Sequence, residues 1–389
     1  MGQGITFKIG VLVIRIEGEH LVTQWAQDVF SILKCSEEPE LVFRFVDQPV
    51  LLRGEKAVGD GHTFVGDRIL SYRERHYDVR IKGGSPVIVE VFQRDRRNVY
   101  VKSLIDLDET WKMWLSHGTS LNMKLLKDFA YSIFLSFLQC SLLERNAALI
   151  HASGFSVDGK GVLLPAWGGV GKSTIMSRAV LHGKAKFLTD DHAVIDAGGQ
   201  MYLHTLPIHA YVYHLDQDKE LKKRVLSGFS GLNRLQWQIG KAIRPKKTVR
   251  WVNPDIIFGE SKMAASAKIA CVVVLFRGKT HDFIWESCSP EDAAIPCAGI
   301  IMSEIRTFSE RIARADAGWH KSLFPSLGDM HRLLLNIYRH AFSHADCARL
   351  MIPAEAGGDA LVDYLRTKCP LIESAFRQDY ERGKKLKHV

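Results

Sequence analysis

The sequence lacks the cysteine patterns that mark disulfide scaffolds and zinc proteins. Its seven cysteines are scattered and include no C-x-x-C pair, so neither a disulfide framework nor a zinc site follows from their spacing. An odd, dispersed set in a chain of 389 residues is typical of reduced thiols, most of them buried as small hydrophobic side chains. We therefore expect free thiols and a cytoplasmic location.

A long hydrophobic run is also missing. The most apolar stretch, 129–143, has about fifteen residues and is interrupted by serines and Gln139, whereas a membrane span needs ~20 apolar residues. No basic segment followed by an apolar core opens the sequence, so a signal peptide is not expected. We predict a buried helix near Leu121–Glu144 and no membrane partner.

The composition that is present is that of a packed soluble protein, with 46% hydrophobic and 24% charged residues. The length exceeds what one hydrophobic core usually organises, which predicts two domains. Fifty-two Lys and Arg against forty-three Asp and Glu give a formal charge of +9. This excess favours anionic partners such as nucleotides, phosphates or acidic peptides, although a basic surface without a partner explains it as well. Nucleic acid is not expected, because no recognised binding module accompanies the charge.

Residues 1–118 predict a small α+β domain. A helical pattern lies at 21–33. Short runs with the alternation of half-buried strands recur at 7–13, 41–46, 77–81 and 87–92. No chemistry is visible in this part, and either it or the basic segment 241–250 is expected to dock the substrate.

From Ala147 the pattern changes to that of a nucleotide-binding α/β domain, which we predict over 119–389. Apolar strands at 148–155 and 161–165 flank an Asp-Gly turn of the hairpin type. A glycine-rich loop, a helix to about Leu181 and another strand follow. This order of strand, loop, helix and strand is the βαβ unit of nucleotide-binding domains.

The glycine-rich loop matches the Walker A pattern, except that alanine stands where the first glycine usually does. We call it the phosphate loop; its residues are Ala166, Trp167, Gly168, Gly169, Val170, Gly171, Lys172, Ser173 and Thr174. The glycines let backbone N–H groups turn toward an anion at a helix start, Lys172 reaches the β- and γ-phosphates, and Ser173 ligates Mg²⁺. The alanine is tolerable only if its φ is negative. The loop predicts ATP and Mg²⁺ as ligands; the alternative is a glycine-rich turn that caps a helix without a ligand.

Two adjacent aspartates, Asp190 and Asp191, follow the next strand. The carboxyl end of that strand should lie beside the phosphate loop, so both carboxylates are expected to face the terminal phosphates. One can hold Mg²⁺, and the other can accept the proton of an attacking hydroxyl. Like charges so close should push their pKa values apart. A Walker B pair for nucleotide hydrolysis is the competing interpretation.

Other polar residues carry weaker signals. His151 lies in the first strand of the hairpin, and a lone histidine is more often structural than catalytic. The segment Lys241–Arg250 packs five cations into ten residues, and its proline and charge predict a loop that is either exposed or faces the transferred phosphoryl group. Metal-capable side chains also occur close together after residue 213, where a polar helix start is the simpler interpretation; they are His214, Asp216 and Asp218.

Four segments taken together resemble HPr kinase/phosphorylase. They are Ile150–Gly154, Gly159–Leu164, the loop end Gly171-Lys172-Ser173 and Thr189–Asp191. The resemblance covers roughly 148–196, with a weak extension through the strand 270–277. It implies a fold related to phosphoenolpyruvate carboxykinase rather than to the common phosphate-loop NTPases.

The resemblance also implies a role for each matching residue. Lys172 would bind phosphates, and Asp191 would accept the proton of the substrate serine. His151 would orient the aspartate pair. The implied metal ligands are Ser173, Asp190 and Asp191.

The chain departs from the family at one motif. A Glu-x-Arg-Gly segment that supplies a further metal ligand has no counterpart between Asp196 and Leu235, and the similar Ser303–Thr307 lies much farther along in a helical pattern. The family's phosphorylase activity, its hexamer and HPr itself as substrate are therefore not carried over. A homo-oligomer is left open.

These observations predict an α/β protein with a P-loop kinase domain of the HPr kinase/phosphoenolpyruvate carboxykinase type. It would transfer the γ-phosphoryl group of ATP to a serine-type hydroxyl, on a small protein or peptide. Two alternatives are a kinase of a small-molecule hydroxyl and a nucleotide-gated binding module with weak ATPase activity.

Overall fold

The computed structural model describes residues 4–48, 56–58, 63–66, 69–74, 76–94, 120–245, 248–318 and 324–377. The chain is mixed α/β, as predicted, and it divides into two compact units. The first unit comprises Met1–Arg145, Phe229–Arg250 and Glu304–His331; the second comprises Asn146–Gly228, Trp251–Ser303 and Arg332–Val389.

This division differs from the predicted domains in two ways. The expected boundary at 118 falls within 95–119, outside the described residues, and the helices that follow belong to the first unit instead of opening the second. The second unit is also interrupted twice by segments of the first. The predicted domain 119–389 was continuous, whereas the contacts divide this range between the two units.

A mixed sheet forms the core of the first unit, in the order β1-β2-β3-β8-β7-β6-β5-β4. Its strands are β1 (Gly4–Ile9), β2 (Leu12–Glu17), β3 (Leu41–Phe45), β4 (Lys56–Val58), β5 (Thr63–Gly66), β6 (Ile69–Arg73), β7 (Tyr77–Lys82) and β8 (Val87–Gln93). The single strand predicted at 7–13 is a hairpin instead, because Gly10 takes a φ of 60° and reverses the chain so that Ile9 pairs with Leu12.

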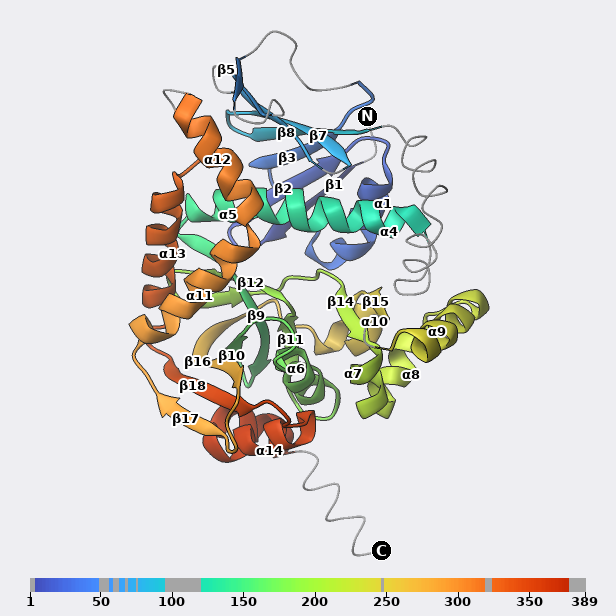
Figure 1. Ribbon diagram of the computed structural model, residues 1–389, viewed down its shortest axis with the longest axis vertical. Helices are drawn as coiled ribbons and strands as arrows, with labels where there is room; N and C mark the ends of the chain where they lie inside the picture. Colours follow the sequence, from blue (N-terminus) through green and yellow to red (C-terminus); the bar gives the residue numbers. More distant parts are fainter. Residues whose placement is uncertain are drawn as a thin grey trace, which may run out of the picture. The chain divides into compact units, whose positions relative to one another are not determined.

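Aromatic side chains join this sheet to the helices of the first unit. The ring of Phe129 meets that of Phe43 edge to face, with centroids 5.6 Å apart, and the centroids of Phe134 and Phe7 of β1 lie 6.4 Å apart. The helices are α1 (Leu21–Val29), the short η1 (Ser31–Leu33), α4 (Ser120–Asp128), the π-helical η2 (Phe129–Phe134), α5 (Leu135–Leu143), α9 (Gly231–Ile243) and α12 (Arg306–Gly318). In Figure 1, α4 and α5 run as one long helix, which confirms the helix predicted at 121–144.

Within the described part of the chain, one helix, Met123–Leu143, is long and apolar enough to cross a membrane. Its most apolar window is 78% buried inside the protein. This burial fits the buried helix predicted at 121–144.

The second unit is built on another mixed sheet, in the order β10-β9-β12-β13-β16-β18-β17, with β11 also paired to β9. Its strands are β9 (Ala147–Val157), β10 (Lys160–Pro165), β11 (Lys186–Thr189), β12 (His192–Asp196), β13 (Gln200–Tyr202), β16 (Ser266–Gly278), β17 (Ile284–Ser287) and β18 (Asp346–Pro353). Because β10 also pairs with β16, the strands β10, β9, β12, β13 and β16 close into a ring. All eleven residues of β9 are buried, since it is paired along both edges.

Helices and a short ribbon complete the second unit. They are α6 (Lys172–Leu181), α7 (Val212–Gln217), α8 (Lys219–Ser227), α10 (Pro254–Phe258), η3 (Glu260–Lys262), α11 (Pro290–Glu304), α14 (Gly358–Lys368) and the ribbon of β14 (Ile208–Tyr211) with β15 (Val249–Val252). Helix α13 (Leu327–Ala341) and the strand β15 each run across a boundary between the two units. All seven cysteines are free and five of them are buried, which confirms the prediction of reduced, mostly buried thiols.

Candidate active site

The phosphate loop connects β10 to α6, as the sequence predicted. Ala166 ends the strand: its N–H donates to the carbonyl of His151 at 3.2 Å, and it is bridged to Leu275 of β16. Its φ is not positive, which meets the condition that alanine imposes at this position. Gly169 and Gly171 carry the left-handed conformations, with φ of 78° and 117°. The loop therefore requires glycine where it turns, and not at its first residue.

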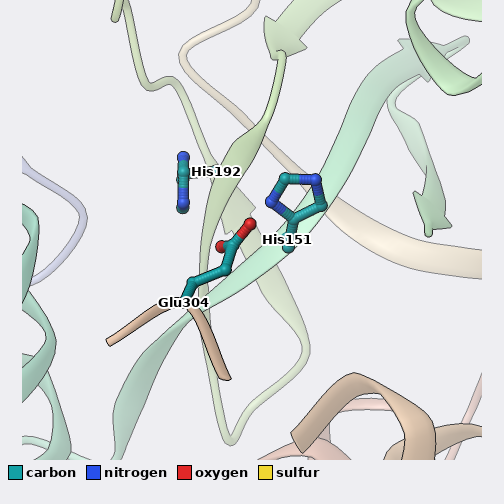
Figure 2. Close-up of side chains that lie close together, drawn as sticks. All are labelled: His151, His192 and Glu304. Atoms are coloured by element: carbon teal, nitrogen blue, oxygen red, sulfur yellow. The ribbon is translucent and has the colours of Figure 1, made fainter. Parts of the chain in front are cut away.

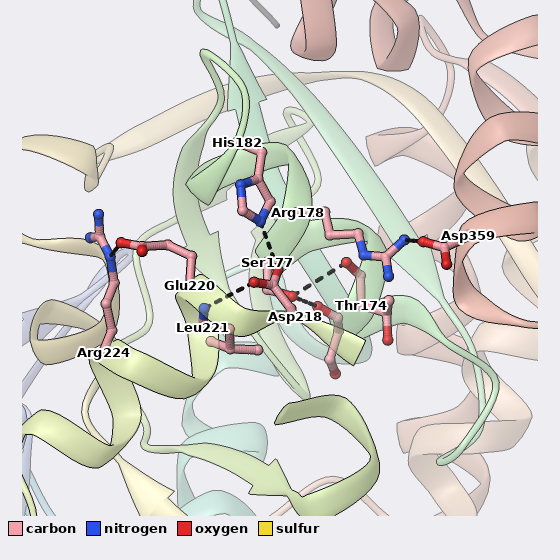
Figure 3. A network of polar contacts seen from close by, with 10 residues as sticks. Thr174, Ser177, Arg178, His182, Asp218, Glu220, Leu221, Arg224 and Asp359 are labelled. Carbon is pink, nitrogen blue, oxygen red and sulfur yellow. Dashed lines mark hydrogen bonds and ion pairs between the residues drawn. The ribbon is translucent and has the colours of Figure 1, made fainter. Parts of the chain in front are cut away.

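Helix α6, which carries Lys172 and Ser173, is fixed to its neighbours by polar contacts (Figure 3). Arg178 pairs with Asp359 of α14, and His182 contacts Asp218 at 2.8 Å. The other oxygen of Asp218 accepts the N–H of Leu221 at 2.9 Å and so caps α8. This agrees with the polar helix start predicted there, and it gives Asp218 a structural role in place of a metal.

Lys172 is the central cation of the site. Its side chain is 4% exposed, and its Nζ lies 2.7 Å from Nε2 of His151 and 3.2 Å from Oδ1 of Asp191. An ammonium group can only donate, so His151 must accept with the Nε2 lone pair. The predicted link between His151 and the aspartates therefore runs through Lys172. Figure 2 shows His151 beside His192, which is paired with it across β9 and β12, with ring centroids 5.3 Å apart.

A tight turn places both aspartates in the site. Strands β11 and β12 both pair with β9, and Asp190-Asp191 forms the break between them. His192 N–H donates back to the Asp190 carbonyl at 2.9 Å, and Ala152 N–H donates to the Asp191 carbonyl at 3.0 Å. Asp191 takes a φ of 65°, which is uncommon outside glycine and is concentrated at functional sites. The turn therefore brings together two neighbouring carboxylates that a regular strand would send to opposite faces.

Asp190 lies deeper than Asp191 and beside the helix start. Its Oδ1 accepts from Ser173 Oγ at 2.8 Å and also from Ser153 Oγ. Burial, with the charge of Asp191 as the second cause, raises the pKa of Asp190 above its usual value. Ser173 and Asp190 are oxygen donors of the kind that Mg²⁺ prefers, so these two residues fit the predicted metal position.

Replacing Asp190 by asparagine should stabilise the fold at neutral pH and weaken Mg²⁺-dependent nucleotide binding. The amide oxygen can still accept from both serines, while the buried charge disappears. A carboxyl whose folded pKa is raised loses folding stability as pH rises from its unfolded pKa of about 3.9 to the folded pKa, at about 1.4 kcal/mol for each pH unit between those two values. The Asp190→Asn variant should lack this pH-dependent loss of folding stability. Urea unfolding between pH 4 and pH 7 measures it, and equal pH slopes for both proteins would contradict the assignment.

The pKa of Asp191 is shifted in the opposite direction from that of Asp190. Its burial favours the neutral form, but the hydrogen bond from His209 and the positive charge of Lys172 outweigh burial and hold its pKa well below the usual range. His209 Nδ1 lies 3.0 Å from Asp191 Oδ2, and Trp251 Nε1 donates to His209 Nε2 at 2.6 Å. The indole N–H is a donor only, so His209 carries its proton on Nδ1 and donates it to Asp191. The two aspartates thus differ in pKa, as the sequence predicted.

The structure brings together Lys172, Ser173, His151 and both aspartates, all of which the sequence singled out. The structure adds three residues to the site that the sequence did not single out: His209, Trp251 and Ser153. Nothing in the sequence marks His209, because it is one isolated histidine in a short strand, and its partner Trp251 lies 42 positions later.

The segment 241–250, predicted as a loop, is a loop only in its middle. Lys241–Ile243 belong to the end of α9, and Val249 and Arg250 begin β15; residues 246–247 lie outside the described part. Arg250 is buried and lies over the ring of Trp237 at 5.4 Å, and burial lowers its pKa to about 10. Part of this charge is therefore packed inside the first unit, and it does not form one exposed basic loop.

Comparison with known proteins adds no assignment. No protein-family model matches the chain, and no curated protein matches it in sequence. The functional argument therefore depends on the geometry of the site and on the resemblance of the motifs.

Proposed function

We propose that the chain is an ATP- and Mg²⁺-dependent kinase of the HPr kinase-like type, which phosphorylates a serine-type hydroxyl. The observation that carries the proposal is the separation of roles between the two aspartates. Asp190 lies against Ser173 at the phosphate loop, whereas Asp191 lies between Lys172 and a histidine that is itself held in place. One carboxylate is thus positioned for metal and the other for a proton.

The proposed reaction needs one proton transfer and one displacement. The acceptor hydroxyl gives its proton to Asp191 while its oxygen bonds to the γ-phosphorus, and the oxygen that bridges the β- and γ-phosphates leaves with ADP. Mg²⁺, held by Ser173 and Asp190, would reduce the negative charge on the phosphates. The backbone N–H groups of the loop and Lys172 act on the same charge.

Lys172 links nucleotide binding to the pKa of Asp191. The same ammonium group that contacts Asp191 is the group expected to donate to the phosphates. When it does so, Asp191 loses part of the positive charge that lowers its pKa and becomes a better proton acceptor. His209 keeps the carboxylate oriented throughout.

The direct test is to incubate the full chain with Mg²⁺ and γ-labelled ATP in two arms. One arm contains a library of peptides with a single serine, and the other contains a panel of amino acids and sugars. We expect mass spectrometry to show a phosphoryl group on a serine peptide. Label found only on the small molecules would favour the alternative, a kinase of a small-molecule hydroxyl. Release of free phosphate alone, equal in both arms, would exclude a kinase.

The Trp251–His209 contact predicts a further effect. Trp251→Phe removes the indole N–H but keeps an aromatic ring, so His209 Nε2 loses the donor that fixes its tautomer. We expect kcat to fall about 10-fold, in the range of one lost hydrogen bond to a charged network, with KM for ATP unchanged. Trp285→Phe, on β17, is the matched control, and an unchanged kcat in the Trp251 variant would contradict the role.

A row of aromatic rings continues from His209 toward the surface. His209 and Tyr211 stack at 6.2 Å, Tyr211 and Tyr213 at 5.2 Å, and His214 meets Tyr213 at 4.3 Å. Burial and, less strongly, the charge of Asp191 raise the pKa of Tyr211, so this row lies within electrostatic reach of Asp191. Tyr213 is 41% exposed. We therefore place the acceptor along these rings.

Removing the outer ring should weaken acceptor binding alone. Tyr213→Ala is expected to raise KM for the acceptor about 2- to 10-fold, the size of one aromatic contact, and to leave KM for ATP unchanged. Tyr364→Ala, whose ring stacks on Phe283 at 4.6 Å, serves as the control. Steady-state kinetics with each substrate varied in turn gives both constants, and a change in KM for ATP instead would place the row on the nucleotide side.

A further inference from the structure

Two cysteines that are far apart in sequence have their sulfur atoms in contact. Cys271 lies on β16 and Cys369 follows α14, 98 positions later, yet their Sγ atoms are 3.3 Å apart. Both residues belong to the second unit, and they are 4% and 5% exposed. Both are free thiols, so the contact brings together two groups that an oxidant can join as a disulfide.

The surroundings shift the pKa values of these two thiols in opposite directions. Residues 370–377 are helical, and the carbonyl of Cys369 accepts the N–H of Glu373 at 2.9 Å, so Cys369 stands at the N-terminus of that helix. The contact with the Cys271 thiol and the N–H groups of Leu371 and Ile372, which donate to its sulfur, lower the pKa of Cys369 to about 7. The same contact raises the pKa of Cys271. A thiol of lowered pKa at a helix N-terminus, next to a second thiol, has two features of a nucleophilic cysteine with a resolving partner.

Three other buried cysteines differ from Cys369 in the direction of their pKa shifts. Burial raises the pKa of the Cys140 and Cys297 thiols, and it raises that of Cys347 to about 12. Thiols with raised pKa values stay protonated at neutral pH and react slowly. Among the buried thiols, Cys369 is therefore expected to be the most reactive.

We propose that Cys271 and Cys369 are a redox modification site that forms a reversible disulfide with hydrogen peroxide as the oxidant. The Cys369 thiolate attacks one peroxide oxygen, the O–O bond breaks, and the leaving hydroxide takes up a proton to give water and a sulfenic acid. The Cys271 sulfur then attacks the Cys369 sulfur, its proton and the sulfenic hydroxyl leave as a second water, and the S–S bond forms. Two thiols and one peroxide thus give one disulfide and two waters.

The bond would connect parts of the second unit that support the phosphate loop. Cys271 lies opposite Val162 of β10, the strand that enters the loop. Cys369 follows α14, whose Leu361 lies 2.8 Å from where a Cβ on Gly171 would stand. The disulfide would therefore fix α14 to the strand that neighbours β10, and this holds whether or not the protein is a kinase.

The experiment uses the full chain, treated with a small molar excess of hydrogen peroxide, alkylated and digested without reductant. We expect mass spectrometry to find one linked peptide that contains Cys271 and Cys369, a loss of two alkylatable thiols per chain, a higher melting temperature, and reversal of all three by dithiothreitol. Cys288→Ser, a half-buried cysteine outside the pair, should leave the linkage unchanged. Cys369→Ala should abolish it and keep Cys271 alkylatable.

The wild-type protein alone can overturn the proposal, so the test does not depend on the folding of any variant. The proposal fails if folded, peroxide-treated protein keeps both thiols free. It also fails if Cys369 is oxidised to the sulfinic acid without the linkage, or if the linked peptides pair Cys271 or Cys369 with other cysteines instead.

Discussion

Replacing Asp191 by asparagine is expected to lower phosphoryl transfer about 100- to 10,000-fold, the usual contribution of a positioned acid or base. The amide cannot take the acceptor's proton, but it keeps an oxygen that accepts from His209. ATP affinity should be unchanged or slightly higher, because a negative charge next to the phosphates is removed. Single-turnover transfer measures the first quantity and calorimetric titration with ATP the second.

Asparagine is the informative substitution because of the backbone at this position. Asp191 has a φ of 65°, a conformation that asparagine adopts more readily than alanine does. Asp158 offers a matched control, since it takes a φ of 51° in the hairpin turn and its ion pair with Lys184 is exposed. Asp158→Asn should retain full activity. If Asp191→Asn transferred phosphate at the wild-type rate, the proton acceptor would have to be another group, whereas a binding module would keep its partner function in both variants.

The parts of the site that the sequence predicted are local. The phosphate loop follows a buried strand and precedes a helix within a few residues, so the spacing of apolar and glycine residues predicts it. The positions of Asp190 and Asp191 follow from the next strand of the same unit. The tight turn between β11 and β12 was not predicted, because adjacent aspartates give no sign that one of them adopts a left-handed backbone.

The parts that the sequence could not predict depend on contacts between distant segments. Trp251 reaches His209 across 42 positions, and nothing in either segment indicates the other. Arg250 belongs to a strand of four residues, too short for its alternation to stand out beside five cations and a proline. The interleaving of the two units also depends on contacts between distant segments. Only such contacts assign Phe229–Arg250 to the first unit.

Replacing Lys172 by methionine is expected to weaken ATP binding about 10- to 100-fold, which corresponds to the loss of about 1.5–3 kcal/mol from hydrogen bonds to a charged group. Methionine keeps the length and most of the volume of the side chain, which matters at a position that is 4% exposed. Lys184→Met is the matched control, since its ion pair with Asp158 lies outside the phosphate loop. ATP affinity that is unchanged in Lys172→Met would contradict the assignment of the loop.

The same variant has a second consequence that does not require nucleotide. Lys172 helps to hold the pKa of Asp191 below its unfolded value, so the pair contributes folding stability above about pH 3.9 and loses it as pH falls through the folded pKa. Without the ammonium group the pKa of Asp191 rises and this contribution shrinks. Lys172→Met should therefore be less stable than the wild type at pH 7, and the difference should narrow as the pH approaches about 2, where Asp191 becomes protonated in the unfolded state of both proteins. Urea unfolding at a series of pH values separates this electrostatic loss from a packing defect, which would lower stability equally at every pH.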